Sequence, residues 1–298
     1  MLAKVFRPRN IALDTPLAAK PATKERSTRS GKKKRVQTQH PASKQQPRRQ
    51  LYDAFLVLDV EATCQLGSSF DYPNEIIEFP VCLMRWKDTA DGGQSQLEVV
   101  DEFRSFVKPS WRPTLSQFCT QLTGITQDQV DGAPNFAGVL ALMHRFLVKN
   151  GLLDAETGQP LMRFCWCCDG PWDIRDFFVK QCFISQVDMP DWIRGDMLDV
   201  RLLVAHSLTT QHKPNPIPNP RSPNTFRRTL NIPGQLKALG LSPFEGTLHS
   251  GIDDTRNIAR IVAELARRGI RLQPNTVIQP DRQWPWMGTQ GQVLEAYA

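Results

Sequence analysis

The stretch "AFLVLDVEATC", residues 54–64, runs from a block of apolar residues directly into two acids. The apolar block predicts a buried β-strand. Because alternate residues of a strand point to the same face, Asp59 and Glu61 would share one face. Two carboxylates so close repel each other unless a cation lies between them or one is protonated. The stretch therefore suggests either a metal site, whose oxygen ligands suit Mg²⁺ or Mn²⁺, or solvated acids at the end of a strand.

Length and composition narrow the class of protein. The 298 residues are enough for one large domain or two small ones. No apolar run approaches the ~20 residues that a membrane helix needs, so we expect no membrane span. The seven cysteines are odd in number and scattered, which argues against a disulfide framework and favours a reducing compartment.

The basic charge is concentrated at the N-terminus. Residues 1–50 hold 14 of the 37 Lys and Arg but two of the 30 acids, which leaves 23 basic and 28 acidic residues elsewhere. With few large apolar side chains, this segment predicts a disordered basic tail. Its "GKKKR" cluster, residues 31–35, fits a nuclear address, a phosphate-binding arm or simply a solvated tail. We expect a location in the cytoplasm, the nucleus or both, although the basic first ten residues also fit a mitochondrial transit peptide.

The order of the expected elements predicts the fold class. Strands are expected at residues 52–60, 75–86 and 97–107, with a hairpin-like connection at Asp91–Gly93, which together suggest an antiparallel meander. Further elements follow: helices at 116–125 and at 135–150, the latter ended by Gly151, a strand at 161–168, a helix at 173–184, a short strand at 197–200, and helices at 229–239 and 251–268. This order indicates an α/β fold with a mixed β-sheet flanked by α-helices. The domain is expected to span residues 51–275, with a proline-rich insertion at 209–226 and an irregular extension at 276–298.

A second signal lies near the C-terminus, in "HSGIDDTRNIARIVAEL", residues 249–265. At helical spacing Asp254 shares the apolar face, so it points inward and needs a partner. A metal held jointly with Asp59 and Glu61 would supply one. Asp253 falls with Asn257 on the opposite, wet face, where Asp253 would complement the helix dipole after an N-cap at Ser250. His249, in the loop before the helix, is a candidate general base because its ordinary pKa is about 6.5.

A third signal is "CDGPWDIRDFF", residues 168–178, where three acids compete for one role. Asp169 fits a cap in a strand-to-helix turn, and Asp176 fits an exposed pair with Lys180 at helical spacing. Asp173, at the start of a helix, is the best candidate for a fourth inward acid. Spacing alone leaves this choice open.

Together these motifs resemble a known family. "LDVEATC", "NEIIEFP", "FCTQLTGITQDQVDGAPNF", "CDGPWD" and "HSGIDDTRNIARI" are similar to the Eri (enhanced RNA interference) branch of the DEDDh exonucleases, which have the ribonuclease-H-like fold. The resemblance runs from about Tyr52 to Arg268. It implies that the acid after the tryptophan, Asp173, is the third metal-binding acid rather than Asp169. The family's best-known members carry a small folded nucleic-acid-binding module before the nuclease, whereas here we recognise only the basic tail.

The resemblance also implies the site and the reaction. The metal-binding acids would be Asp59, Glu61, Asp173 and Asp254. They would hold two Mg²⁺ ions, or Mn²⁺ in their place, and His249 would be the general base. The 3′-terminal nucleotide would lie near Ala62, Thr63, Leu122, Thr123 and Trp172, where Leu122 and Trp172 grip base and sugar. This arrangement requires Asp254 to lie within about 10 Å of Asp59, because the two ions of such sites are ~4 Å apart.

The implied function is that of a 3′→5′ exoribonuclease in RNA processing or RNA interference. It would release 5′-mononucleotides from RNA 3′ ends that are single-stranded or form a short overhang. Small interfering duplexes, histone message stem-loops and ribosomal RNA 3′ ends all remain open as substrates. A DNA exonuclease on the same fold and a non-catalytic RNA-binding scaffold are the alternatives. Of the cysteines, Cys64, Cys165, Cys167 and Cys168 are expected to be small packing residues rather than zinc ligands.

Overall fold

The computed structural model describes residues 50–87, 96–210 and 229–297. Almost all of the basic tail, the Asp91–Gly93 connection and most of the proline-rich insertion lie outside these ranges. The described residues from Gln50 onward belong to one unit. Among them, no helix combines the length and the hydropathy that a membrane crossing requires.

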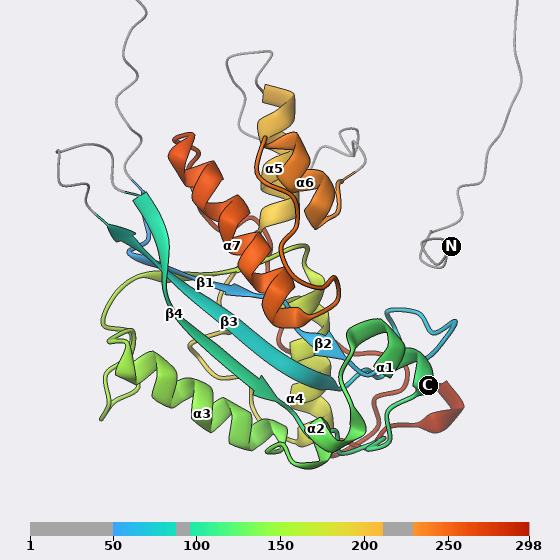
Figure 1. Cartoon of the computed structure of the whole chain (residues 1–298). Coiled ribbons are helices and arrows are strands. Elements are labelled where there is room, and N and C mark those ends of the chain that lie inside the picture. Colours follow the sequence, from blue (N-terminus) through green and yellow to red (C-terminus); the bar gives the residue numbers. More distant parts are fainter. Residues whose placement is uncertain (1–49, 88–95, 211–228, 298) are drawn as a thin grey trace, which may run out of the picture. The chain divides into compact units, whose positions relative to one another are not determined.

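A mixed sheet forms the centre of this unit (Figure 1). Strand β1 pairs antiparallel with β3, and β3 pairs antiparallel with β4, which confirms the predicted meander. On the other side of β1, strands β5 and β6 add in parallel. The short strand β2 pairs with β3 beyond the end of β1. The strands are β1 (Ala54–Leu58), β2 (Glu61–Ala62), β3 (Ile76–Lys87), β4 (Gln96–Phe106), β5 (Phe164–Cys168) and β6 (Leu198–Asp199).

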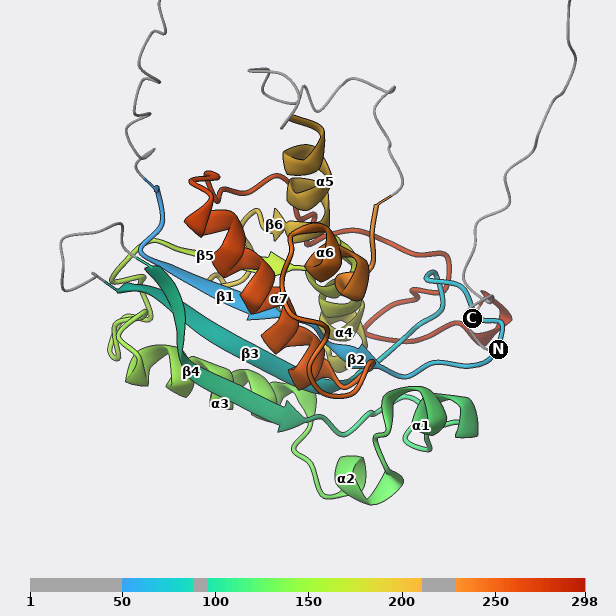
Figure 2. The same ribbon diagram turned by 45° about the horizontal axis from the view of Figure 1, so that its top comes forward.

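Helices cover both faces of the sheet, as the predicted fold class requires. Both views place α3 and α7 on opposite sides of it (Figures 1 and 2). The helices are α1 (Gln117–Thr123), α2 (Gln127–Asp131), α3 (Phe136–Lys149), the π-helical segment η1 (Asp173–Phe178), α4 (Val179–Ser185), α5 (Val200–Thr210), α6 (Ile232–Ala238), α7 (Gly251–Arg267) and the short 3₁₀ helix η2 (Glu295–Tyr297). Three of them, α2, α5 and η2, were not predicted from the sequence.

The side chains of β1 divide between two cores. Leu56 and Leu58 pack in the core that contains α3 and α4, whereas Phe55 and Val57 pack in the core that contains α6 and α7. This alternation is the ordinary period of a strand. Asp59 and Glu61 continue the odd-numbered positions, so the chain directs them toward the α7 side of the sheet.

The C-terminal extension is irregular but well packed. Trp284 and Trp286 are buried, with their rings stacked at 6.2 Å between centroids. Arg282, from the same extension, forms an ion pair with Asp176 on η1. The prediction that Asp176 is exposed and pairs with Lys180 is therefore wrong, because both side chains are buried. Lys180 Nζ instead donates to backbone carbonyls, including that of Tyr72 at 2.8 Å.

The first residue of α7 sits directly against the end of β1. A Cβ atom added to Gly251 would lie 2.8 Å from the carbonyl oxygen of Asp59 and 3.1 Å from both Glu78 Oε2 and Pro80 Cγ. The Gly251 N–H donates to Glu78 Oε2 at 3.2 Å. Glycine at this position therefore permits the close approach that brings α7 to the acids following β1.

Gly251→Ala is expected to destabilise the protein, although alanine ordinarily favours a helix over glycine by about 1 kcal/mol. The added methyl group has no room, and overpacking of this kind typically costs about 1–3 kcal/mol. Thermal unfolding measures the effect. Gly195→Ala is the matched control, since a Cβ there meets nothing within 4 Å. Equal melting temperatures for the two variants would contradict the close approach.

Candidate active site and metal centre

Three predicted acids meet at one point of the fold. Asp59, Glu61 and Asp254 each offer a carboxylate oxygen, and these oxygens lie within 4.8 Å of one another. Asp59 and Glu61 follow β1, while Asp254 lies in the first turn of α7 and is buried, as its helical position predicts. The condition that Asp254 lies close to Asp59 is therefore met. A set of carboxylate oxygens at this spacing fits a hard divalent cation.

The fourth predicted acid, Asp173, lies beside this cluster. It opens η1 and is buried, and its Oδ1 accepts a hydrogen bond from the backbone N–H of Val60 at 2.9 Å. This bond ties the start of η1 to the residue between Asp59 and Glu61. The π-helical geometry of η1 is itself uncommon and occurs often at functional sites.

Asp169, the competing acid, is engaged elsewhere. Its carboxylate pairs with Arg201 on α5, whose Nε lies 3.2 Å from Oδ2, and accepts a hydrogen bond from Gln235 Nε2 at 2.6 Å. It does not cap the strand-to-helix turn, as one alternative expected. With a guanidinium already beside it, Asp169 is a neutralised structural acid.

Burial and mutual repulsion raise the pKa of the clustered acids. Desolvation first, and then neighbouring carboxylates such as Asp173 and Asp254, hold the pKa of Asp59 well above its ordinary value. Burial likewise raises the pKa of Asp173 to about 7 and that of Asp254 to about 7, although backbone N–H donors partly offset the shift. Such a cluster is unfavourable without a cation, which is the condition that favours metal binding.

His249 lies in the loop that leads into α7. Its backbone has a positive φ of 64°, uncommon for a residue other than glycine, and its N–H donates to Asp254 Oδ2 at 2.8 Å. Although the residue is largely exposed, partial desolvation of the imidazole lowers its pKa. The exposed histidine is thereby tied through its own backbone to an acid of the cluster. Ser250 is the N-cap residue, but its side chain makes no capping hydrogen bond, which corrects that part of the prediction.

The predicted nucleotide-binding residues fall on the segments around the cluster. Cys119 of α1 lies with its Sγ 3.7 Å from the carbonyl oxygen of Ala62, so α1, which carries Leu122 and Thr123, lies next to β2. Leu122 is partly exposed. The hydroxyl groups of Thr63 and Thr123 both accept backbone N–H groups inside the protein, from Glu75 at 2.9 Å and Ile125 at 3.1 Å. These two threonines thus shape the backbone of the region.

Trp172 lies between two side chains that the sequence did not indicate. Its ring stacks on Phe70 at 5.6 Å between centroids, and the guanidinium of Arg201 lies 5.0 Å from its ring centroid. Arg201 in turn pairs with Asp169. The tryptophan before Asp173 is therefore held in place by a cation and an aromatic ring from two other segments.

Two further acids help to build the site. Glu78, on β3, is opposite Glu61 in the strand register and bridges Arg104 on β4 to the Gly251 N–H. Glu75 accepts the backbone N–H groups of residues 110–112. Both carboxylates are buried. The signal for them was present in "NEIIEFP", since acids inside an apolar strand need partners.

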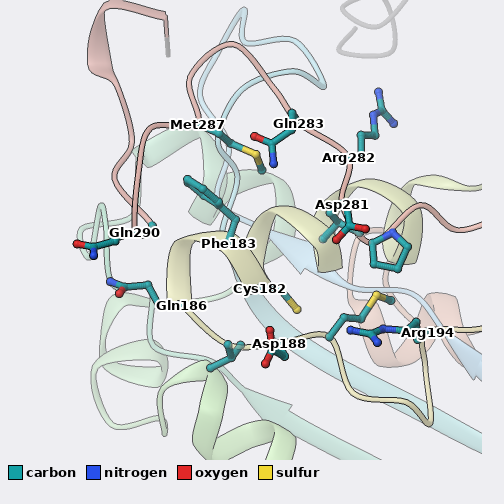
Figure 3. Close-up of a pocket in the computed structure, with 15 residues that line it drawn as sticks. Cys182, Phe183, Gln186, Asp188, Arg194, Asp281, Arg282, Gln283, Met287 and Gln290 are labelled. Carbon is teal, nitrogen blue, oxygen red and sulfur yellow. The ribbon is translucent and has the colours of Figure 1, made fainter.

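A cavity of about 390 Å³ lies away from this cluster, between α4 and the C-terminal extension (Figure 3). Its lining includes Cys182, Phe183, Arg194 and Met287. None of the acids of the cluster contributes to its walls. The cavity is a feature of how the C-terminal extension packs, separate from the metal-binding acids.

Comparison with known proteins agrees with this geometry. The profile of the family described as "Exonuclease" matches residues 56–210. The "3'-5' exonuclease eri1" of Schizosaccharomyces pombe is 37% identical over 234 residues, which cover 74% of this chain and 70% of that protein. The "3'-5' exoribonuclease 1" of Rattus norvegicus is 34% identical over 224 residues, covering 75% of this chain but 56% of the relative. This chain thus matches little more than half of the rat protein's length.

Two solved structures share the fold. The nuclease domain of 3′hExo, described as a DEDDh family member bound to rAMP, has a TM-score of 0.60 and 30% identity, covering 76% of this chain and 98% of that one. The structure described as 3′-end-specific recognition of histone mRNA stem-loop by 3′-exonuclease has a TM-score of 0.62 and 29% identity, covering 77% of this chain and 69% of that one. The mixed sheet is therefore the ribonuclease-H-like sheet of the DEDDh enzymes. By profile, relatives and fold, the chain belongs to the Exonuclease family, in its ERI1 branch of 3′–5′ exoribonucleases.

Proposed function

We propose that this protein is a 3′→5′ exoribonuclease that shortens RNA one nucleotide at a time and releases 5′-mononucleotides. The observation that carries the proposal is the meeting of Asp59, Glu61 and Asp254 within 4.8 Å, supplied by two segments far apart in the sequence. Asp173 lies beside this cluster, where it accepts the Val60 N–H, and His249 lies beside it, where its own N–H donates to Asp254. All the residue types needed for hydrolysis of a phosphodiester are thus gathered in one place.

The metal that fits best is Mg²⁺, with Mn²⁺ as a substitute, because all candidate ligands are carboxylate oxygens. Asp59, Glu61, Asp173 and Asp254 would hold two ions. When bound, the ions supply charge stabilisation for the attacking and leaving oxygens of an in-line displacement. The protein's own part is to fix the carboxylates and to keep His249 neutral, since its lowered pKa leaves the imidazole free to accept a proton from the attacking water.

The proposed substrate is the 3′ end of an RNA, either single-stranded or a short overhang beside a stem. Trp172 and Leu122 would contact the terminal base and sugar by apolar packing, which tolerates any base. The basic tail would add salt-dependent attraction to phosphate groups, and its "GKKKR" cluster favours a nuclear as well as a cytoplasmic location.

The central test follows the decay of a 5′-end-labelled single-stranded RNA and of a hairpin with a short 3′ overhang. We expect stepwise shortening from the 3′ end, 5′-mononucleotide products and complete loss of activity in EDTA. Asp59→Asn should abolish turnover, because it removes a metal-binding charge. His249→Asn should lower kcat by about 10²–10⁴-fold, the usual contribution of a general base. Asparagine is chosen because it tolerates the left-handed backbone of this position.

Asp191→Asn is the matched control, since its side chain is almost fully exposed, at 93%. A DNA oligonucleotide of the same sequence tests the alternative substrate. Faster decay of DNA than of RNA would favour a DNA exonuclease, and internal cuts alone would defeat the exonuclease proposal. Tight RNA binding without turnover in Mg²⁺ or Mn²⁺ would favour a binding scaffold.

The raised pKa values also predict a link between pH, metal and stability. A carboxyl group whose pKa is higher in the folded than in the unfolded chain stabilises the fold while protonated. For Asp173 and Asp254 this contribution is present below pH about 4 and is lost as the pH rises through about 7. In EDTA at pH 8, Asp59→Asn should therefore melt above the wild type, because it removes one of the repelling charges.

Thermal unfolding at pH 5.5 and pH 8, with EDTA or with Mn²⁺, measures this link. We expect Mn²⁺ to raise the melting temperature of the wild type by several degrees at pH 8, because about 1 kcal/mol corresponds to roughly 2–4 °C in a domain of this size. The rise should be smaller at pH 5.5, because Asp173 and Asp254 are then protonated and bind the ion less well. Asp59→Asn should lose most of that rise. An Asp59→Asn protein that melts below the wild type in EDTA at pH 8 would show that the acids do not repel.

A further inference from the structure

The loop that carries His249, residues 245–250, is exposed but has a constrained backbone. Gly246 has a φ of 97° and His249 a φ of 64°. A left-handed conformation at a residue other than glycine costs free energy and persists only when its surroundings impose it. The loop contains no helix or strand of its own, so side chains from neighbouring elements must impose this conformation.

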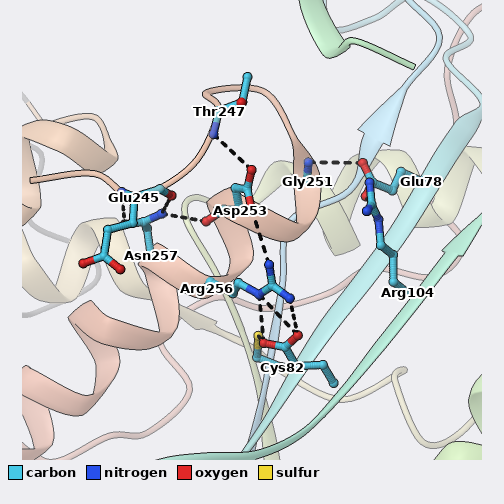
Figure 4. A network of polar contacts seen from close by, with 10 residues as sticks. Glu78, Cys82, Arg104, Glu245, Thr247, Gly251, Asp253, Arg256 and Asn257 are labelled. Carbon is cyan, nitrogen blue, oxygen red and sulfur yellow. Dashed lines mark hydrogen bonds and ion pairs between the residues drawn. The ribbon is translucent and has the colours of Figure 1, made fainter. Parts of the chain in front are cut away.

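Asn257, two turns into α7, holds the first residue of the loop (Figure 4). Its Oδ1 accepts the Glu245 N–H at 3.1 Å, and its Nδ2 donates to the Glu245 carbonyl at 2.8 Å. Nδ2 also donates to the carbonyl of Asp253 at 2.7 Å. Asn257 is fully buried, which corrects its expected place on the wet face of the helix. The side-chain amide of Asn257 thus binds both the backbone N–H and the backbone carbonyl of Glu245, which fixes the start of the loop to α7.

Asp253 holds the middle of the loop. Its Oδ2 accepts the Thr247 N–H at 3.0 Å, so its carboxylate does more than complement the helix dipole (Figure 4). Gly246 permits this contact, because a Cβ added there would lie 2.4 Å from Asp253 Cγ. With Asp254 bound to the His249 N–H, every second residue of the loop donates its N–H to a side chain of α7.

We propose that Asn257 and Asp253 are positioning residues for the general base: they hold the loop so that the imidazole of His249 reaches the attacking water. The inference rests on the proposed exoribonuclease function. A general base must lie within about 2.6–3.2 Å of the group that it deprotonates. A displacement of about 1 Å from the productive geometry can cost roughly 10²-fold in rate. Neither residue touches substrate; both act through His249.

The test measures kcat and KM for RNA shortening in Mg²⁺ with single and double variants. Asp253→Ala and Asn257→Ala should each lower kcat by about 10- to 100-fold and leave KM within about twofold. In the His249→Asn background the same substitutions should lower kcat by less than about threefold, because the base that they position is gone. Asp253→Asn keeps an oxygen acceptor for the Thr247 N–H, so it should retain kcat within about threefold of the wild type.

Asn150→Ala is the matched control for Asn257→Ala. Asn150 also uses its side-chain amide within the protein, at the end of α3 on the other face of the sheet. Equal losses of kcat with and without His249 would overturn the proposal, as would a loss that appears mainly in KM. Equal losses for Asp253→Asn and Asp253→Ala would also overturn it, because the charge rather than the hydrogen bond would then be responsible.

Amide hydrogen exchange gives a readout that does not depend on activity. The N–H groups of Glu245, Thr247 and His249 should exchange slowly in the wild type and faster in Asp253→Ala. An unchanged exchange rate would overturn the positioning role even if RNA is degraded. A wild-type protein that protects these amides but does not shorten RNA would instead defeat the proposed function alone. Should Asn257→Ala not fold, the Asp253 pair of variants decides the question.

Discussion

Electrostatic repulsion among the clustered carboxylates is the constraint on which the arrangement of this protein depends. Asp59, Glu61 and Asp254 lie close enough to share a cation, and Asp173 adds its charge to theirs. Backbone N–H groups offset part of the repulsion, from Val60 to Asp173 and from His249 to Asp254. Each of these bonds also fixes one segment to another. The first bond joins the end of β1 to η1, and the second joins α7 to the loop before it, while Gly251 brings the start of α7 against Asp59 and Glu78. The contacts that offset the repulsion are therefore also contacts that order the segments around the site.

The fold around the site follows from local patterns where those patterns are strong. The alternating side chains of β1, the meander through β3 and β4, and the inward position of Asp254 could all be predicted, because strand and helix periods decide which side chains are buried. Helix α5 was missed because it follows β6 without a turn residue and leaves Leu202 exposed, so its apolar period is weak. Helix α2 has only five residues, too few to show a period, although its capping box at Thr126 was a readable signal.

Pairings that depend on distant segments could not be predicted from spacing. Lys180 and Asp176 stand four residues apart, yet Asp176 pairs with Arg282 from the C-terminal extension, and Lys180 is buried against the loop after β2. Trp284 lies 5.2 Å from the Lys180 ammonium, measured to its ring centroid, and so helps to accommodate the cation. A helix-surface rule presumes that the surface faces water. Here the C-terminal extension covers it, and the local rule fails for that reason.

The choice between Asp169 and Asp173 shows what distinguishes a metal-binding acid from a structural one. Both are buried and both lie near Asp59, so proximity does not separate them. Asp169 has Arg201 beside it, which compensates its charge. Within the part of the chain that the structure describes, Asp59, Glu61, Asp173 and Asp254 form no ion pair with lysine or arginine. Asp173 and Asp254 accept backbone N–H groups, whose dipoles lower the cost of burial but leave a net negative charge. Neighbouring buried acids such as Asp169 have a cationic side chain beside them, whereas this cluster has none among the described residues. The cluster therefore retains negative charge that a divalent ion can neutralise.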